Sequence, residues 1–461
     1  MTRSQDTIAA LSSGPGRAGV AVVRVSGPAA ASCIEQLSGK AVPQPRTAVL
    51  RALRRPGSGE MIDRALVLWM PGPGTFTGGD VVEFHVHGGR AVVTALLEVL
   101  LKVPGVRAAE PGEFTLRAFR NGRIDLTAAE GLADLIDAET EAQRRQAVAL
   151  SGGLLGQAAA EIRADLIRSL ALMEAVLDFA DEADVTEGAL KEASDIGRRV
   201  MQRLQTVLAG ARHGEIVRDG FRVVLAGAPN AGKSSLLNAL ARRDVAIVSP
   251  EPGTTRDVIE VRLDLGGHLV IVADTAGLRQ AAGAVEAEGM RRTIERARTA
   301  DLTIWVVDAT APVWTPDAAL SRQQGCTDSS CIDSPIFLLR NKIDLVAPDA
   351  LAAQFRGAPA RIDADVSGAI GHGVAELVAA IEARAKSSDP GDGGVPVATA
   401  RQRQLIENAI EDLAAFLDGS PDLELRAEHL RRAAFALGRL VGHVDVEDVL
   451  GQIFGRFCIG K

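Results

Sequence analysis

The stretch FRVVLAGAPNAGKSSLLN, Phe221–Asn238, decides the fold of the chain around it. An apolar run over Val223–Ala226 predicts a buried strand, and the residues after Ser234 follow a helical pattern. Between them, Gly227–Ser234 has the G-x-x-x-x-G-K-[ST] spacing of a phosphate-binding loop. Its two glycines let successive backbone N–H groups turn toward one point, and its lysine and hydroxyl can reach phosphates and Mg²⁺. The strand–loop–helix context therefore predicts a nucleotide-binding α/β domain.

Four further motifs follow the phosphate loop. Gly253–Asp257 supplies threonines for a Mg²⁺ shell, and Asp274–Gly277 ends an apolar strand with a carboxylate that can hold a metal-bound water. The final carboxylate of Asn341–Asp344 can accept two hydrogen bonds from guanine that adenine does not offer. Val366–Ala369 lies where a loop commonly supports the other edge of guanine. Five motifs in this order, each at a strand end, predict a GTPase. The residues expected to contact GTP are Asn230, Ala231, Gly232, Lys233, Ser234, Ser235, Thr254, Thr255, Asp274, Thr275, Ala276, Gly277, Asn341, Lys342, Asp344 and Ser367.

The sequence lacks the glutamine that usually orients the attacking water after the Asp274–Gly277 motif. Leu278 stands at that position and cannot orient a water. Arg256 and Arg279 are nearby in sequence, but neither is an obvious arginine finger. Asn230, inside the phosphate loop, can help bind a monovalent cation that supplies the missing positive charge. A loop-stabilising role for Asn230 is an equally good interpretation.

The composition is ordinary for a soluble protein of several domains. The chain has 461 residues, 47% of them hydrophobic, and a formal net charge of −8. No apolar run approaches the roughly 20 residues that cross a bilayer, and the N-terminus lacks the apolar segment of a signal peptide, so we expect a cytosolic (cytoplasmic) protein. The negative charge argues against non-specific coating of nucleic acid but leaves room for a local RNA site. The 4 cysteines match neither a disulfide framework nor a zinc pattern.

Changes in hydrophobic period divide the chain into four segments. Residues 1–120 alternate strand-like and helix-like patterns and predict a small α+β domain. Residues 121–216 are helical, 217–385 hold the nucleotide motifs, and 386–461 return to a helical period after a Gly/Pro-rich linker. The expected fold class is α/β plus all-α, with one discontinuous helical domain into which a P-loop (Ras-like) G domain is inserted. The long helices expected before the G domain are Thr127–Ser151, Leu155–Ala180 and Glu187–Ala211.

Several motifs outside the G domain are specific to one family. They are Asp6–Ala10, Gly16–Val20, Phe76–Gly78, His87–Gly89, Pro111–Thr115, Asn121–Leu126 and the ending Phe457–Lys461. With the GTPase motifs, they make the whole chain resemble the MnmE (TrmE) tRNA-modification GTPases. The resemblance implies an N-terminal domain similar to folate-binding aminomethyltransferases that mediates homodimerisation.

The same resemblance implies a reduced folate of the 5-formyl-tetrahydrofolate type in the N-terminal domain. By matching motifs, Arg24, Glu83, Arg123 and Lys461 would contact it. Taken without the resemblance, the first three can also be a surface charge, a strand residue and a charge at a helix start. A lysine as the last residue is unusual for a solvated tail.

The resemblance further implies potassium-stimulated GTP hydrolysis through dimerising G domains. Potassium (K⁺) would be held by the side chains of Asn230 and Thr254 and by carbonyls of Ser249–Glu251, which adds Ser249 to the GTP site. Ser234 and Thr255 would ligate Mg²⁺.

Two further residues would take part in catalysis by the same resemblance. Glu286 would orient the attacking water in place of Leu278, although alone it resembles a solvated charge. With an FAD-containing partner, MnmG (GidA), the family installs aminomethyl or carboxymethylaminomethyl groups at carbon 5 of the wobble uridine of certain tRNAs. Cys458 is a candidate for that chemistry; otherwise it is a small apolar residue near the terminus.

Some positions depart from the family pattern. Gly79 stands where the family usually has an acidic residue, Gln280 where glutamate is common, and Gly368 where alanine is usual. The stretch Ala311–Ser334 resembles an irregular insertion. None of these is a phosphate or metal position. The alternative function is an RNA- or ribosome-associated assembly GTPase switch, which has no use for a folate-like domain or for the ending CIGK.

Overall fold

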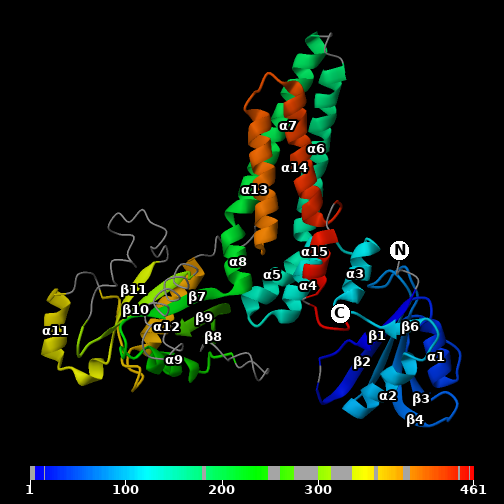
Figure 1. Cartoon of the computed structure of the whole chain (residues 1–461), viewed down its shortest axis with the longest axis horizontal. Helices are drawn as coiled ribbons and strands as arrows, with labels where there is room; N and C mark the ends of the chain where they lie inside the picture. The colour runs from blue at the N-terminus through cyan, green and yellow to red at the C-terminus, as the bar shows by residue number, and fades with distance from the viewer. Residues whose placement is uncertain are drawn as a thin grey trace, which may run out of the picture. The chain divides into compact units, whose positions relative to one another are not determined.

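The structure is a computed structural model that describes residues 6–14, 16–178, 183–247, 260–274, 300–312, 335–357, 362–387, 395–444, 447–455 and 457–461. The chain forms two compact units (Figure 1). The first comprises Met1–Ala133, Ala149–Leu204 and Leu405–Lys461, and the second comprises Asp134–Val148 and Gln205–Gln404. Both units are therefore discontinuous in sequence. The domain boundaries expected at residues 120, 216 and 385 stay a prediction.

The first unit contains a six-stranded sheet in the order β3-β4-β5-β2-β1-β6. All neighbouring strands pair antiparallel except β1 and β6. One face is covered by two helices, whose Ile34 and Leu96 pack among buried strand residues such as Phe84. The strands are β1 (Thr7–Leu11), β2 (Ala18–Ser26), β3 (Ala48–Arg54), β4 (Met61–Met70), β5 (Val81–Gly88) and β6 (Val106–Ala108), and the covering helices are α1 (Ala30–Ser38) and α2 (Arg90–Leu100).

The opposite face of this sheet is only partly covered. Phe114 of α3 (Glu113–Arg120) packs with Ile8 and Ala10 of β1. At the other end of the same face, Leu50 of β3 and Leu66 of β4 stand opposite each other and are 63% and 47% exposed. Two apolar side chains in register on an open sheet face indicate a surface with room for a partner.

Helices make up the rest of the first unit, and the longest of them run side by side in Figure 1. Gly197 of α7 leaves no space for a Cβ beside Phe416 of α13, and buried residues of α14 include Leu430 and Leu437. Asp422 caps α14 by accepting a hydrogen bond from the Leu425 N–H. The helices with most of their length in this unit are α4 (Leu126–Asp137), α6 (Leu154–Asp178), α7 (Ala183–Ala209), α13 (Ala400–Leu417), α14 (Leu423–Val441) and α15 (Glu447–Phe454).

The single helix predicted over Thr127–Ser151 is wrong, because the chain breaks between α4 and α5 (Glu141–Ser151). The Gln143 side-chain oxygen accepts hydrogen bonds from the backbone N–H groups of Glu139 and Thr140, which caps the new helix. Within the second unit, Glu139 also pairs with Arg262 at 2.6 Å. These contacts, rather than a glycine or proline, set the break.

The second unit contains a six-stranded sheet in the order β12-β11-β10-β7-β9-β8. All neighbours are parallel except the edge pair β8–β9. Alternate residues such as Val223, Val270 and Ile304 bury one face against α9 and α12. The elements are β7 (Phe221–Ala226), β8 (Glu260–Leu265), β9 (His268–Asp274), β10 (Leu302–Asp308), β11 (Ile336–Asn341), β12 (Ala364–Asp365), α8 (Ala211–Asp219), α9 (Lys233–Ala241), α11 (Pro348–Gly357) and α12 (Val374–Ser387). The predicted fold class is confirmed.

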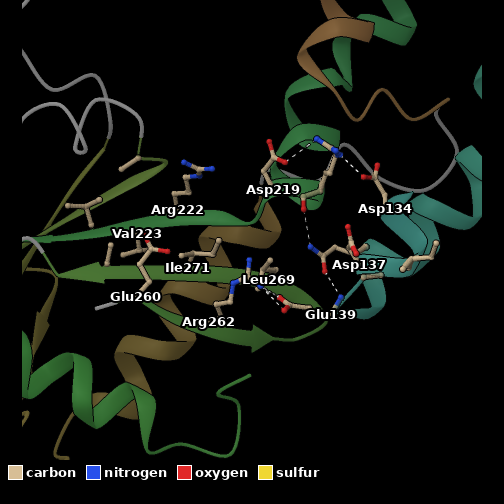
Figure 2. A pocket seen from close by; sticks show the side chains of 17 residues that line it. Asp134, Asp137, Glu139, Asp219, Arg222, Val223, Glu260, Arg262, Leu269 and Ile271 are labelled. Atoms are coloured by element: carbon tan, nitrogen blue, oxygen red, sulfur yellow. Dashed lines mark hydrogen bonds and ion pairs between the residues drawn. The ribbon is translucent and has the colours of Figure 1, made fainter. Parts of the chain in front are cut away.

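A cavity of about 890 Å³ lies between the α4–α5 connection and one side of this sheet. Figure 2 shows its charged lining, in which Glu139 meets Arg262 and Asp134 meets the neighbouring Arg218 at 2.8 Å. Most of its charged groups are thus neutralised within the unit. In the described ranges, no helix is long and apolar enough to cross a membrane.

Candidate functional site

The phosphate loop joins β7 to α9 in a conformation that requires its glycines. Gly227 and Gly232 have φ angles of 138° and 89°, and Asn230 also has a positive φ of 62°. A Cβ on Gly227 would lie 2.3 Å from the Val306 carbonyl oxygen of β10, so no larger residue fits there. The loop therefore lies directly on the central strands, with the start of α9 behind it.

Lys233 and Ser234 open α9 and lie where phosphate chemistry needs them. The buried Lys233 ammonium donates to the carbonyls of Gly227 and Ala228, both at 2.9 Å, which holds it over the loop. The Ser234 hydroxyl donates to a carboxylate oxygen of Asp274, at the end of β9, at 2.7 Å. A hydroxyl beside a carboxylate is a set of hard oxygen donors, which suits Mg²⁺.

Asn341 connects the phosphate loop with the two loops predicted to read guanine. Its amide nitrogen donates to the Ala231 carbonyl at 2.9 Å, and its oxygen accepts from the Gly368 N–H at 3.0 Å. Next to it, the Lys342 ammonium pairs with Asp308 at 2.6 Å. Burial alone would raise the pKa of Asp308, but its bonds to Lys342 and Thr310 outweigh burial and lower it. Asn341 therefore acts as a brace, because it bonds to two loops at once.

The predicted guanine-reading residues lie in these two loops. Asp344 is exposed, while Ser367 is buried and its hydroxyl accepts from the Ile370 N–H at 3.4 Å. The same loops carry Leu345 and Ile370, which are 66% and 69% exposed. Neither apolar residue was predicted to belong to the site. The sequence feature that could have identified them is a large hydrophobic residue directly after each motif.

Part of the predicted nucleotide site lies outside the described residues. This holds for eight predicted positions, namely Ser249, Glu251, Thr254, Thr255, Thr275, Ala276, Gly277 and Glu286. Their roles stay predictions. Among the described residues, no group of three or more His, Cys, Asp or Glu side chains could hold a metal ion.

In the N-terminal sheet, the structure brings two predicted folate residues together. Arg24 of β2 and Glu83 of β5 are register partners and form an ion pair at 2.9 Å. The other oxygen of Glu83 lies 3.2 Å from His85 Nε2. The Arg24 guanidinium also lies 5.8 Å from the centre of the Phe114 ring. Phe114 is fully buried, so it supports the guanidinium from below, and the carboxylate and guanidinium are the groups that can bind a flat polar heterocycle such as a reduced folate.

The C-terminal tail, residues Phe457–Lys461, lies against the start of this sheet. The Ser12 hydroxyl donates to the Gly460 carbonyl at 2.9 Å, and Ile459 forms a β-bridge with Pro111. A Cβ on Gly460, whose φ is 100°, would lie 1.9 Å from the Leu11 carbonyl oxygen. Lys461 is thereby fixed near the N-terminal end of the fold.

Two other predicted residues are placed less directly. Arg123 is exposed and follows α3, and its side chain approaches the Gly78 loop, where Asn121 donates to the Thr77 carbonyl at 2.6 Å. Cys458 is exposed in the C-terminal tail. By contrast, burial raises the pKa of the Cys33 thiol to about 12, so that this thiol is inert at neutral pH.

A half-buried ion-pair cluster that the sequence did not reveal anchors α3 beside β1 and β6. Arg107 donates to Asp6 at 2.6 Å and to Glu113 at 2.8 Å, and Arg117 donates to the same two carboxylates at 2.7 and 3.0 Å. Burial would raise the pKa of Glu113, but the bonds to Arg107 and Arg117 outweigh burial and lower it.

Comparison with known proteins places the chain in a family. Residues 7–123 match the family model of the GTP-binding protein TrmE N-terminus, and residues 126–458 match the MnmE helical domain. A tRNA modification GTPase MnmE from Methylobacterium sp. (strain 4-46) is 49% identical, with 99% of this chain and 100% of the relative covered. Those from Methylorubrum populi and Rhodopseudomonas palustris (strain BisB18) are 50% and 47% identical, covering 99% and 100% of this chain and 98% and 100% of the relatives. The chain belongs to the MnmE (TrmE) family of tRNA modification GTPases.

Proposed function

We propose that this GTPase is potassium-dependent and that its GTP cycle drives modification at carbon 5 of the wobble uridine of tRNA. It acts as a homodimer with an FAD-containing MnmG (GidA) partner, and the added group is aminomethyl or carboxymethylaminomethyl. The observation that carries the GTPase chemistry of the proposal is the 2.7 Å contact between Ser234 and Asp274 beside the Lys233 ammonium. It places a hydroxyl, a carboxylate and a cation together at the carboxyl ends of neighbouring parallel strands.

In the G domain each residue has a distinct role. Lys233 leaves its two carbonyl partners to contact the β- and γ-phosphates, and Asp344 accepts two hydrogen bonds from guanine. Ser234 and Thr255 are the protein ligands of Mg²⁺, which neutralises charge on the phosphates when bound. Glu286 orients the attacking water.

Potassium compensates for the missing arginine finger. Asn230 and Thr254 bind it with their side chains, and Ser249–Glu251 bind it with carbonyls, including those of Ser249 and Glu251. The exposed side chain of Asn230 supports this role, because its amide oxygen is accessible to a cation. A cation held by these residues would stabilise the negative charge that develops on the phosphates during hydrolysis.

In the N-terminal domain, Arg24, Glu83, Arg123 and Lys461 bind a reduced folate of the 5-formyl-tetrahydrofolate type. The Arg24–Glu83 pair supports this assignment, since its polar atoms are half-buried beside Phe114 and are offered to one side of the sheet. Cys458, exposed in the C-terminal tail, takes part in the modification.

Homodimerisation uses the open face of the N-terminal sheet. The exposed, register-paired Leu50 and Leu66 support this, because a second copy would remove both from water. We propose that the domains are an N-terminal domain (1–120), a helical domain in two parts (121–216 and 386–461) and a G domain (217–385) that interrupts the helical domain.

The decisive experiment is GTP turnover by the purified chain in matched KCl and NaCl, with Asn230→Ala and the control Asn238→Ala. Asn238 is exposed on α9, away from the loop. We expect KCl to raise turnover at least about ten-fold in the unaltered chain and in Asn238→Ala, and this stimulation to disappear in Asn230→Ala. Equal rates in both salts would reject the potassium mechanism. A chain that also binds no reduced folate would favour the assembly-switch alternative.

A further inference from the structure

A cleft of about 690 Å³ in the first unit lies where three helix junctions meet. It is lined by the α3–α4 connection, the turn before α6 and the end of α14. The polar side chains that it gathers are those of Arg120, Arg123, Asp125, Gln157 and His443. Arg123 is also one of the proposed folate residues, but neither the folate site, the GTP site nor the ion-pair cluster at Glu113 accounts for the other four.

Close backbone approaches hold the walls of the cleft together. A Cβ on Gly442, at the end of α14, would lie 2.6 Å from the Phe119 ring. A Cβ on Gly156, in the first turn of α6, would lie 1.8 Å from a carboxylate oxygen of Asp125. Because both contacts require glycine, the three junctions are packed in one arrangement and the cleft is preformed.

The cleft is electropositive. Arg120, Arg123 and His443 are exposed, and in the part of the chain that the structure describes no carboxylate pairs with either guanidinium. Asp125 is the one acidic side chain in the lining, and its carboxylate accepts from the Thr127 hydroxyl at 2.6 Å and from the Ala128 N–H at 2.9 Å. The lining therefore holds two guanidinium groups and one carboxylate. The N-terminus of the 25-residue helix α6 adds partial positive charge.

The other two large cavities are balanced in charge or acidic. The cavity in Figure 2 has three arginines and five carboxylates, and two of its arginines are already paired. The groove between α13 and α14 holds three arginines and three carboxylates, with Arg431 bonded to Glu174 and Glu428 and Arg432 near Asp412. Of these three cavities, only the cleft beside Arg120 has more arginines than carboxylates in its lining.

We propose that this cleft binds the phosphate backbone of tRNA, with Arg120 contacting phosphate oxygens, His443 and Gln157 donating hydrogen bonds, and Arg123, assigned above to the folate, adding positive charge to the lining. This inference rests on the proposed function, which makes tRNA the substrate. A chain with a net charge of −8 repels a polyanion over most of its surface, so RNA must be met by a local cationic site. Planar guanidinium groups suit phosphate.

The test is fluorescence anisotropy of a labelled tRNA transcript titrated with the full-length chain at several KCl concentrations. We expect Arg120→Ala to raise Kd about ten-fold, in line with the loss of one charge-assisted contact, and to lower the salt slope by about 1. Arg120→Glu should raise Kd further. Arg120→Lys keeps the charge and should stay within about three-fold of the unaltered chain.

The matched control is Arg198→Ala, since Arg198 is an exposed arginine of α7 that is occupied by Asp195 at 2.6 Å. Its Kd should not change. Thermal unfolding of each variant checks that the fold is kept. A reduced-folate titration of the same variants separates phosphate recognition from binding of folate carboxylates.

The outcomes separate the two proposals. If the unaltered chain binds tRNA and Arg120→Glu binds it equally well, the cleft is not the RNA site and the proposed function stands. Weaker folate binding with unchanged RNA affinity in Arg120→Glu would assign the cleft to folate carboxylates and overturn the inference. An unaltered chain without affinity for tRNA would overturn the proposed function as well.

Discussion

In the sheet of the second unit, the phosphate loop, Asp274 and Asn341 all follow the carboxyl ends of parallel strands, whereas in the N-terminal sheet Arg24 and Glu83 lie inside antiparallel strands. Parallel strands bring the ends of several segments to one edge, so functional residues gather in loops. Antiparallel strands gather residues on a face, according to register. In the first arrangement the chemistry depends on the conformation of the loops, while in the second it depends on what covers the face.

The largest effect is expected at the edge of the parallel sheet. Lys233→Ala removes the ammonium that Gly227 and Ala228 hold over the phosphate loop, and we expect turnover of saturating GTP to fall about 100-fold or more. Lys102→Ala, at an exposed lysine of the N-terminal domain, should leave turnover unchanged. If GTP turnover in Lys233→Ala fell by less than about three-fold, the loops at the edge of the parallel sheet would not be the site of GTP hydrolysis.

A smaller effect is expected from the cover of the antiparallel face. Gly460→Ala forces a Cβ against the Leu11 carbonyl and should displace the C-terminal tail, lowering the affinity for a reduced folate about ten-fold. The control is Gly57→Ala, since Gly57 has a similar φ of 89° but nothing within 4 Å of the added Cβ. Isothermal titration calorimetry measures both. Equal affinities would show that this face binds its ligand without the tail.

The smallest effect concerns the acid stability of the N-terminal domain. Because Arg107 and Arg117 lower the pKa of Glu113 in the folded state, its ionised form stabilises the fold above its unfolded pKa. This contribution is lost as the pH falls through the folded pKa, that is, below about 4.3, the ordinary value for glutamate. We expect Glu113→Gln to have a lower free energy of unfolding than the unaltered chain at pH 7, and this difference to become smaller toward pH 3.

Urea unfolding at several pH values measures this difference. Glu98→Gln is the control, because Glu98 is exposed and its contact with Arg55 is 3.3 Å long. If the difference in unfolding free energy between Glu113→Gln and the unaltered chain stays constant with pH, the cluster stabilises the fold through packing rather than charge.

The difference between the parallel and the antiparallel sheet also explains which elements could be predicted from the sequence. β7, β9 and β11 were predictable, because each is an apolar run that ends in a motif such as Asp274 or Asn341. Motif chemistry at a strand end is local in sequence, so that the geometry around Lys233 follows from spacing alone.

Long-range contacts were not predictable in this way. β1, β6 and α3 are short and were missed; α3 is held by Arg107 and Asp6, which lie 101 residues apart. The break at Glu139 likewise depends on contacts with Arg262 of the G-domain sheet. The pairing of Arg24 with Glu83 requires the register of β2 against β5, which no local pattern encodes.

The contact between Ser12 and Gly460 joins residues 448 positions apart. During synthesis the N-terminal strands leave the ribosome first, yet Gly460 reaches Leu11 only after nearly all of the chain has been translated. The first domain to emerge is therefore among the last to acquire its finished surface. An abandoned, partly translated chain would hold a folded sheet without Lys461, and so without one of the groups proposed to bind its ligand.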